Sequence, residues 1–321
     1  MFASYVLLAV FGMASAELLS GSSPLWFVSP WALLVTFPLY FLHIVFLWSV
    51  AVRFQKTAWY QLYFLGVMFA LYEAWITKVL WIGYPSNGGF VFGEVAGVGI
   101  GEYVALVLWW HPVMSFIVPI ALYQLISGKV LPEFQSLLQY GKKKWRLILA
   151  LVVGCGPIVA TSHGFFAPAA WFTILGTFLM VALLRKRQLV DIRALAVSRM
   201  GFWAYGILLT LLYLVTYPKL VPEGIPQTVE PIVVILLTYV VAVYLFARSQ
   251  KATSTESVLG SEFFSWQQIR TVFLVFGVSV TIFSVLPPVA IIGISVWYIA
   301  LMTGGVYIAV AALKARSRER K

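Results

Sequence analysis

The chain has 321 residues, of which 62% are hydrophobic and only 10% are charged. Soluble globular domains carry about 25% charged residues, so this composition excludes a water-soluble fold. The net charge of +11 does not indicate nucleic-acid binding, because the basic residues form short clusters beside apolar runs. One cysteine, Cys155, leaves the chain without an internal disulfide or a cysteine-based metal cluster. We therefore expect a protein of the lipid bilayer with no nucleic-acid partner.

Apolar runs follow one another along the whole chain. A helix needs about 20 apolar residues to cross roughly 30 Å of hydrocarbon. The runs predict an all-α, polytopic transmembrane helix bundle of about ten spans, in a single integral membrane domain over 1–321. The predicted spans are residues 2–19, 30–52, 59–83, 103–127, 146–162, 166–184, 201–217, 231–247, 270–287 and 289–313. The small residues 14–16 also fit a signal-peptidase site, so cleavage after residue 16 is left open.

The placement of positive charge predicts the orientation of the chain. Twenty of the 22 Lys and Arg residues lie in alternate gaps between the spans or at the C-terminal end. They are Arg53, Lys56, Lys129, Lys142, Lys143, Lys144, Arg146, Arg185, Lys186, Arg187, Arg193, Arg199, Arg248, Lys251, Arg270, Lys314, Arg316, Arg318, Arg320 and Lys321. Cytoplasmic loops carry the excess of Lys and Arg, so we expect these gaps and both termini in the cytoplasm. The clusters also predict contact with anionic lipids, with the plasma membrane as the location.

Two connecting segments differ in composition from the rest. Residues 249–263 are mostly small and polar, and we expect them to form a flexible cytoplasmic link. Residues 85–101 contain six glycines and lie on the outer side of the predicted topology. This second segment is either a mobile gate above the membrane or a plain flexible loop.

Ionisable residues are concentrated in the first four spans. This asymmetry divides the chain into a polar-site half, 1–127, and a mainly apolar scaffold half, 146–313. An ionisable side chain inside a span is costly and indicates function by default. The candidates for binding a ligand or a proton are Glu17, His43, Glu73, Lys78, Glu102 and His111.

Glu73 and His111 are predicted to lie at one level of the membrane. Glu73 comes about ten residues, or about 15 Å, below the outer end of the third span. His111 comes about nine residues, or about 13 Å, below the outer end of the fourth. Adjacent helices would bring the carboxylate and the imidazole within hydrogen-bonding distance. Pro112 follows the histidine and frees the carbonyl of Leu108, which favours a kink and a cavity facing outward.

The other candidates have simpler explanations. Lys78 points away from Glu73 and is expected to reach the outer interface, with neutralisation by Glu102, or by Glu94 in the adjoining loop, as the alternative. Glu17 and Glu102 lie near outer helix ends, where hydration is sufficient to explain them. His43 has no partner that the sequence identifies, and a structural role is expected.

Three functional hypotheses remain open. The first is a secondary transporter in which Glu73, with His111, binds a proton or cation and a small solute enters from outside. The length, the ten spans and the cytoplasmic termini resemble the architecture of drug/metabolite transporters, although no motif matches residue by residue. The second is an intramembrane enzyme with Glu73 as general base and His111 as its partner, or with His43, Glu73 and His111 as metal ligands. The third is a non-catalytic membrane scaffold subunit.

Overall fold

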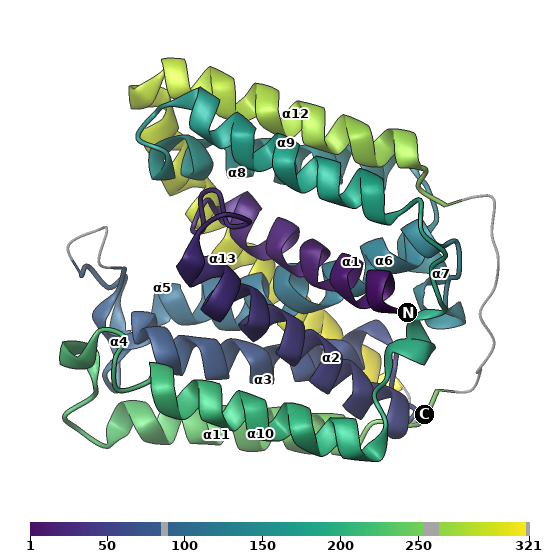
Figure 1. Ribbon diagram of the computed structural model, residues 1–321. Helices are drawn as coiled ribbons and strands as arrows, with labels where there is room; N and C mark the ends of the chain where they lie inside the picture. Colours follow the sequence, from purple (N-terminus) through teal and green to yellow (C-terminus); the bar gives the residue numbers. More distant parts are fainter. Residues whose placement is uncertain (85–88, 253–262, 319–321) are drawn as a thin grey trace. The chain divides into compact units, whose positions relative to one another are not determined.

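A computed structural model describes residues 1–84, 89–252 and 263–318. The described chain is mostly helical (Figure 1), which confirms the predicted all-α, multi-pass membrane bundle. The first half contains α1 Phe2–Met13, η1 Ala14–Leu18, η2 Ala32–Thr36, α2 Phe37–Arg53, α3 Trp59–Thr77, α4 Val79–Ile82, α5 Ile100–Glu102, η4 Tyr103–Ile117, α6 Val118–Ser127 and α7 Pro132–Leu138. The second half contains α8 Lys142–Ser162, α9 Ala167–Leu184, η5 Ile192–Leu195, α10 Arg199–Thr216, η6 Pro222–Gly224, α11 Glu230–Ala247, α12 Trp266–Val285 and α13 Pro287–Arg318.

Among the described residues, eight helices are long and apolar enough to cross a membrane. They are Ala32–Arg53, Ile100–Ser127, Lys142–Ser162, Ala167–Leu184, Arg199–Thr216, Glu230–Ala247, Trp266–Val285 and Pro287–Arg318. A shorter apolar helix, Phe2–Leu18, covers the first predicted span, and α3 covers most of the third. The chain is an integral, multi-pass membrane protein. The total of ten spans and the cytoplasmic termini stay predictions.

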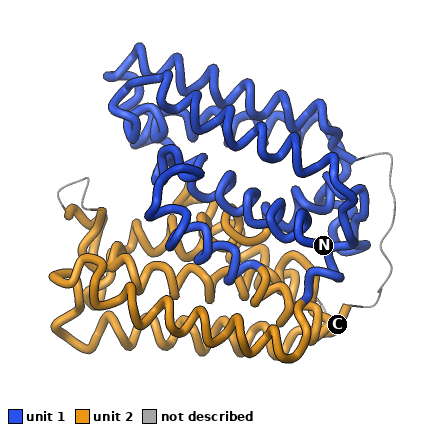
Figure 2. The backbone as a smooth tube through the Cα atoms, viewed as in Figure 1, with its two compact units in different colours: residues 1–44, 118–196, 253–299 blue, residues 45–117, 197–252, 300–321 orange. Residues whose placement is uncertain are grey.

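The chain packs as two compact units, each assembled from segments that are far apart in the sequence (Figure 2). Unit 1 consists of residues 1–44, 118–196 and 253–299, and unit 2 of residues 45–117, 197–252 and 300–321. These units divide the chain by packing, whereas the predicted halves divide it by the placement of ionisable residues. The single-domain prediction stays a prediction.

Contacts between connecting segments agree with the predicted sidedness within each unit. In unit 1, the hydroxyl of Ser4 accepts a hydrogen bond from the amide of Val190, joining the N-terminus to a gap predicted to share its side. In unit 2, the guanidinium of Arg53 donates to the carbonyl of Val197 at 2.8 Å, again between two gaps predicted to be cytoplasmic. The indole of Trp81 donates to a carbonyl of η6, between two gaps predicted to face outward.

A short hairpin occupies part of the glycine-rich segment between α4 and α5. Strands β1 Glu94–Val95 and β2 Val98–Gly99 pair antiparallel, with Glu94 opposite Gly99. Ala96 and Gly97 both have positive φ, 52° and 71°, which is the backbone of a two-residue type I′ hairpin turn. The sequence analysis did not predict these strands. Residues 85–88 of the same segment, and 253–262 of the predicted flexible link, lie outside the described residues.

Candidate functional site

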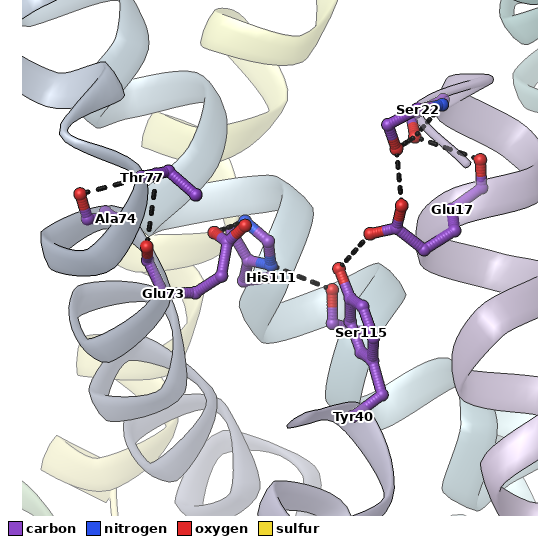
Figure 3. Close-up of polar contacts among 9 residues, drawn as sticks. Glu17, Ser22, Tyr40, Glu73, Ala74, Thr77, His111 and Ser115 are labelled. Atoms are coloured by element: carbon purple, nitrogen blue, oxygen red, sulfur yellow. Dashed lines mark hydrogen bonds and ion pairs between the residues drawn. The ribbon is translucent and has the colours of Figure 1, made fainter. Parts of the chain in front are cut away.

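Glu73 and His111 form an ion pair inside unit 2 (Figure 3). Oε2 of Glu73, on α3, lies 2.6 Å from Nε2 of His111, on η4. His111 is 3% exposed, whereas the side chain of Glu73 keeps 19% of its surface accessible. The two residues therefore meet as their predicted depths require, and the side chain of Glu73 is the more exposed of the two.

The second ring nitrogen of His111 also has a partner. Nδ1 lies 3.0 Å from the hydroxyl oxygen of Ser115, which is fully buried one helical turn further along η4. The ring of Phe69 lies 5.8 Å from the imidazole between centroids. Both imidazole nitrogens are thus engaged, which fixes the ring between a carboxylate and a hydroxyl. The sequence analysis missed Ser115, although its spacing of four residues from His111 places it on the same helix face.

The backbone around His111 is wider than an ordinary helix. Residues 103–117 have the i→i+5 hydrogen-bond pattern of a π-helix, and Pro112 lies inside it. π-Helical turns are rare and frequently occur at functional sites. The carbonyl of Leu108, four residues before the proline, accepts a hydrogen bond from the hydroxyl of Tyr63 at 2.9 Å. In this i→i+5 pattern the missing N–H of Pro112 would have paired with the carbonyl of Val107, so the expectation that Pro112 frees the carbonyl of Leu108, which assumed an α-helix, was wrong.

Glycine allows α3 and η4 to approach each other closely next to this histidine. A Cβ atom built on Gly66 would lie 2.5 Å from the Cα of Pro112, closer than real side chains allow. Gly66 precedes Glu73 by seven residues, which is almost two full turns, so both lie on the same face of α3. The close approach and the ion pair therefore belong to one helix interface.

Helix α3 ends within two turns of Glu73. The hydroxyl of Thr77 donates to the carbonyls of Glu73 and Ala74, at 3.1 and 3.4 Å. Lys78 then takes a left-handed backbone conformation, with φ of 57°, and ends the helix. The carboxylate thus lies near the end of the helix that carries it.

Lys78 extends to the end of α10 that the predicted topology places on the outer side, but protein and not water surrounds its ammonium there; its depth in the membrane stays a prediction. Its side chain is fully buried, and its ammonium donates to the carbonyls of Tyr217 and Leu220, just beyond the end of α10. The ammonium also lies 4.7 Å from the centre of the Tyr217 ring. A cation at the C-terminal end of a helix is stabilised by the helix dipole and by the unpaired carbonyls. Lys78 therefore has a structural role as a long-range helix cap.

Glu17 forms a second polar centre, inside unit 1 (Figure 3). Its Oε1 accepts a hydrogen bond from the hydroxyl of Tyr40 at 2.6 Å. Its Oε2 accepts from Ser22 at 2.8 Å and from Ser23 at 2.5 Å. Glu17 is buried, so the expectation of a hydrated carboxylate was wrong: three hydroxyl groups take the place of water.

The two remaining candidates have local backbone partners. Glu102 is buried, and its Oε2 accepts a hydrogen bond from the amide of Phe92 at 3.1 Å, which ties down the segment that leads into the hairpin. Hydration therefore does not explain Glu102 either. His43 is buried in unit 1, with Nδ1 2.8 Å from the carbonyl of Leu39 on the same helix. This local bond agrees with the structural role expected for His43.

A metal centre receives no support from the described residues. Within 1–84, 89–252 and 263–318, no group of three or more His, Cys, Asp or Glu side chains could hold a metal ion. The arrangement on α3 and η4 is instead suited to moving a proton, because a carboxylate, an imidazole and a hydroxyl stand in hydrogen-bond sequence.

Comparison with known proteins places the chain in a family. The model of an uncharacterized membrane protein family matches residues 6–320. The chain belongs to this family. It is also similar to an uncharacterized protein of Archaeoglobus fulgidus, with 33% identity over 196 residues. That match covers 59% of this chain and 60% of the archaeal protein. No solved structure matches.

Proposed function

We propose that the protein is a proton-coupled transporter of a small solute and that the Glu73–His111 pair binds and releases the coupling proton. The ion pair at 2.6 Å carries this proposal. A carboxylate and an imidazole at membrane depth are costly to insert, and pumps and transporters use such groups as proton relays. A shared proton can leave through the carboxylate, since Glu73 is the more accessible partner.

The alternative of an intramembrane hydrolase is less consistent with the geometry. Ser115, His111 and Glu73 are the residue types of a serine–histidine–acid triad, and they stand in the corresponding hydrogen-bond order. A nucleophile must reach its substrate, however, and Ser115 is 0% exposed. A buried hydroxyl can still fix the tautomer and orientation of an imidazole, which is what a proton-binding histidine requires.

The vestibule predicted above the pair stays a prediction. Two grooves of unit 1, one between α9 and α12 and one lined in part by Pro157 and Trp297, include neither Glu73 nor His111 in their walls. The proton site can be tested without a solute.

A pH jump on proteoliposomes adsorbed to a solid-supported membrane tests the proton site directly. Proton binding at membrane depth moves charge, so the wild-type protein should give a transient current. Glu73→Gln keeps the shape of the side chain and removes its titratable group, and it should abolish the transient. Glu94→Gln is the matched control, because it removes an exposed carboxylate of the hairpin and should leave the current unchanged. Equal transients in wild type and Glu73→Gln would overturn the proposal and favour a scaffold.

A further inference from the structure

Helices α9 and α12 run side by side in unit 1 (Figure 1), and an aromatic groove lies between them, lined by neither Glu17 nor Glu73. Its volume is about 490 Å³, within the range of sites that hold small organic ligands. Its walls include four aromatic rings, two from each helix: Trp171, Phe178, Trp266 and Phe273. The proposed proton site uses none of these residues.

The aromatic walls are held in place by specific contacts. The indole nitrogen of Trp171 donates to the hydroxyl of Thr281 at 2.9 Å, and its ring occupies the space left by the missing side chain of Gly277. Phe178 stacks on Trp266, with 5.5 Å between centroids and 17° between the planes. These contacts join α9 to α12 along the groove, so the hollow is a fixed feature of the helix pair.

One end of the groove is strongly basic. Arg270 forms part of its wall, and the guanidinium of Arg185 lies 4.1 Å from the centre of the Trp266 ring. Both arginines are exposed. Neither forms an ion pair with a carboxylate of the described residues, 1–84, 89–252 and 263–318. Two fixed positive charges therefore border the groove without an anion from the described part of the protein.

Apart from Gln267 and Thr271, the rest of the groove is lined by apolar and aromatic side chains, and it opens on the outside of the helix pair. Leu175 and Leu274 line it and are 54% and 59% exposed, so in a membrane they face lipid chains. The wall on α12 extends from Trp266 to Leu274, a rise of about 12 Å. The predicted topology places Arg185 and Arg270 at the cytoplasmic surface, and tryptophan is enriched at this level of a membrane. The basic end is thus at headgroup depth, and the apolar part is at chain depth.

We infer that this groove binds one anionic phospholipid of the cytoplasmic leaflet. Arg185 and Arg270 hold the phosphate by charge-assisted hydrogen bonds, and one acyl chain lies along Trp171, Leu175 and Leu274. A free phosphate would use only the basic end and would leave the apolar wall uncovered. This inference is independent of the Glu73–His111 pair, because it concerns other residues in the other unit.

Native mass spectrometry of the detergent-solubilised full chain tests the site. Titration with dioleoylphosphatidylglycerol should yield one tightly retained lipid, and dioleoylphosphatidylcholine should bind less tightly. Arg185→Gln with Arg270→Gln should weaken retention of the anionic lipid about tenfold or more, because two charge-assisted hydrogen bonds are lost. Lys186→Gln with Arg187→Gln removes the same charge outside the groove wall and should change retention less than threefold.

Two further measurements separate a lipid site from simpler explanations. Leu274→Trp fills the chain part without touching the arginines, and it should also weaken lipid retention. An excess of inorganic phosphate should fail to displace the lipid. Equal effects of the two double substitutions, or full displacement by inorganic phosphate, would overturn the inference. Thermal unfolding of each variant checks that the helix pair is intact, and Leu274→Trp provides a second variant if the arginine pair does not fold.

Discussion

The close contact between Gly66 and Pro112 leaves no room for a side chain at position 66 in the α3–η4 interface. Gly66→Ala adds one methyl group, and that group would lie 2.5 Å from a backbone carbon of the neighbouring helix. A flexible side chain could rotate out of the way, but a backbone atom cannot. The two helices must therefore move apart, and the ion pair on the same face of α3 must lengthen.

The expected loss of stability follows from two opposing terms. Overpacking a well-packed interface costs roughly 1–3 kcal/mol, and a backbone clash belongs at the upper end of that range. Alanine gains about 1 kcal/mol over glycine inside a helix. The net loss is about 1–2 kcal/mol, and for a chain of 321 residues we expect the melting temperature to fall by roughly 1.5–3 °C.

Gly206 on α10 provides the matched control. A Cβ built there would lie 3.4 Å from its nearest neighbour, the ring of Phe46, which is an ordinary contact. Gly206→Ala should therefore leave the melting temperature unchanged or raise it. Tryptophan fluorescence during heating in detergent measures both variants, and the pH-jump current reports on the ion pair. A Gly66→Ala protein that melts like wild type and keeps its full current would refute the tight interface.

The remaining predictions concern the buried lysine and the orientation of the chain. Lys78→Met leaves two helix-end carbonyls without their donor, so it should lower the free energy of unfolding by about 2 kcal/mol or more in the same melting assay. Lys219→Met removes an exposed lysine nearby and should have little effect. Single cysteines at Glu94 and Lys251 should react with a membrane-impermeant maleimide from opposite sides of sealed vesicles, and same-side labelling would contradict the predicted topology.

The native cysteine of the chain is buried and therefore does not interfere with the labelling experiment. The native Cys155 lies inside α8 and is 1% exposed, so it should stay unreactive in the folded protein. Reaction of Cys155 with the maleimide before denaturation would show that unit 1 opens around this position. The same measurement therefore checks the packing of α8 against its neighbours, including the apolar groove that Pro157 and Trp297 help to line.

The sequence predicted those features that depend on position along a helix. A rise of 1.5 Å per residue was sufficient to place Glu73 and His111 at one level, because each span begins near a recognisable membrane surface. The alternation of basic clusters predicts which gaps share a side of the membrane, and this stays a prediction with which the contacts of Arg53 and Trp81 agree. Both arguments need only local sequence and the thickness of a bilayer.

The features that were missed depend on which helix faces meet. The sequence did not reveal the partners of Lys78, because the carbonyls that it binds belong to a distant segment of the chain that no local pattern indicates. The sequence did not reveal the burial of Glu17 for the same reason, because the hydroxyl of Tyr40 that binds its carboxylate comes from another helix. Ser115 alone carried a usable signal, since its spacing from His111 is helical.

The distance along the chain between Lys78 and its acceptors has a consequence for biogenesis. The two carbonyls belong to residues 139 and 142 positions later. At a synthesis rate of about 5–20 residues per second, the ribosome needs roughly 7–28 s to make them. During that interval the ammonium must stay hydrated or be held by the insertion machinery, so the end of α3 can settle fully into place only after α10 has been made.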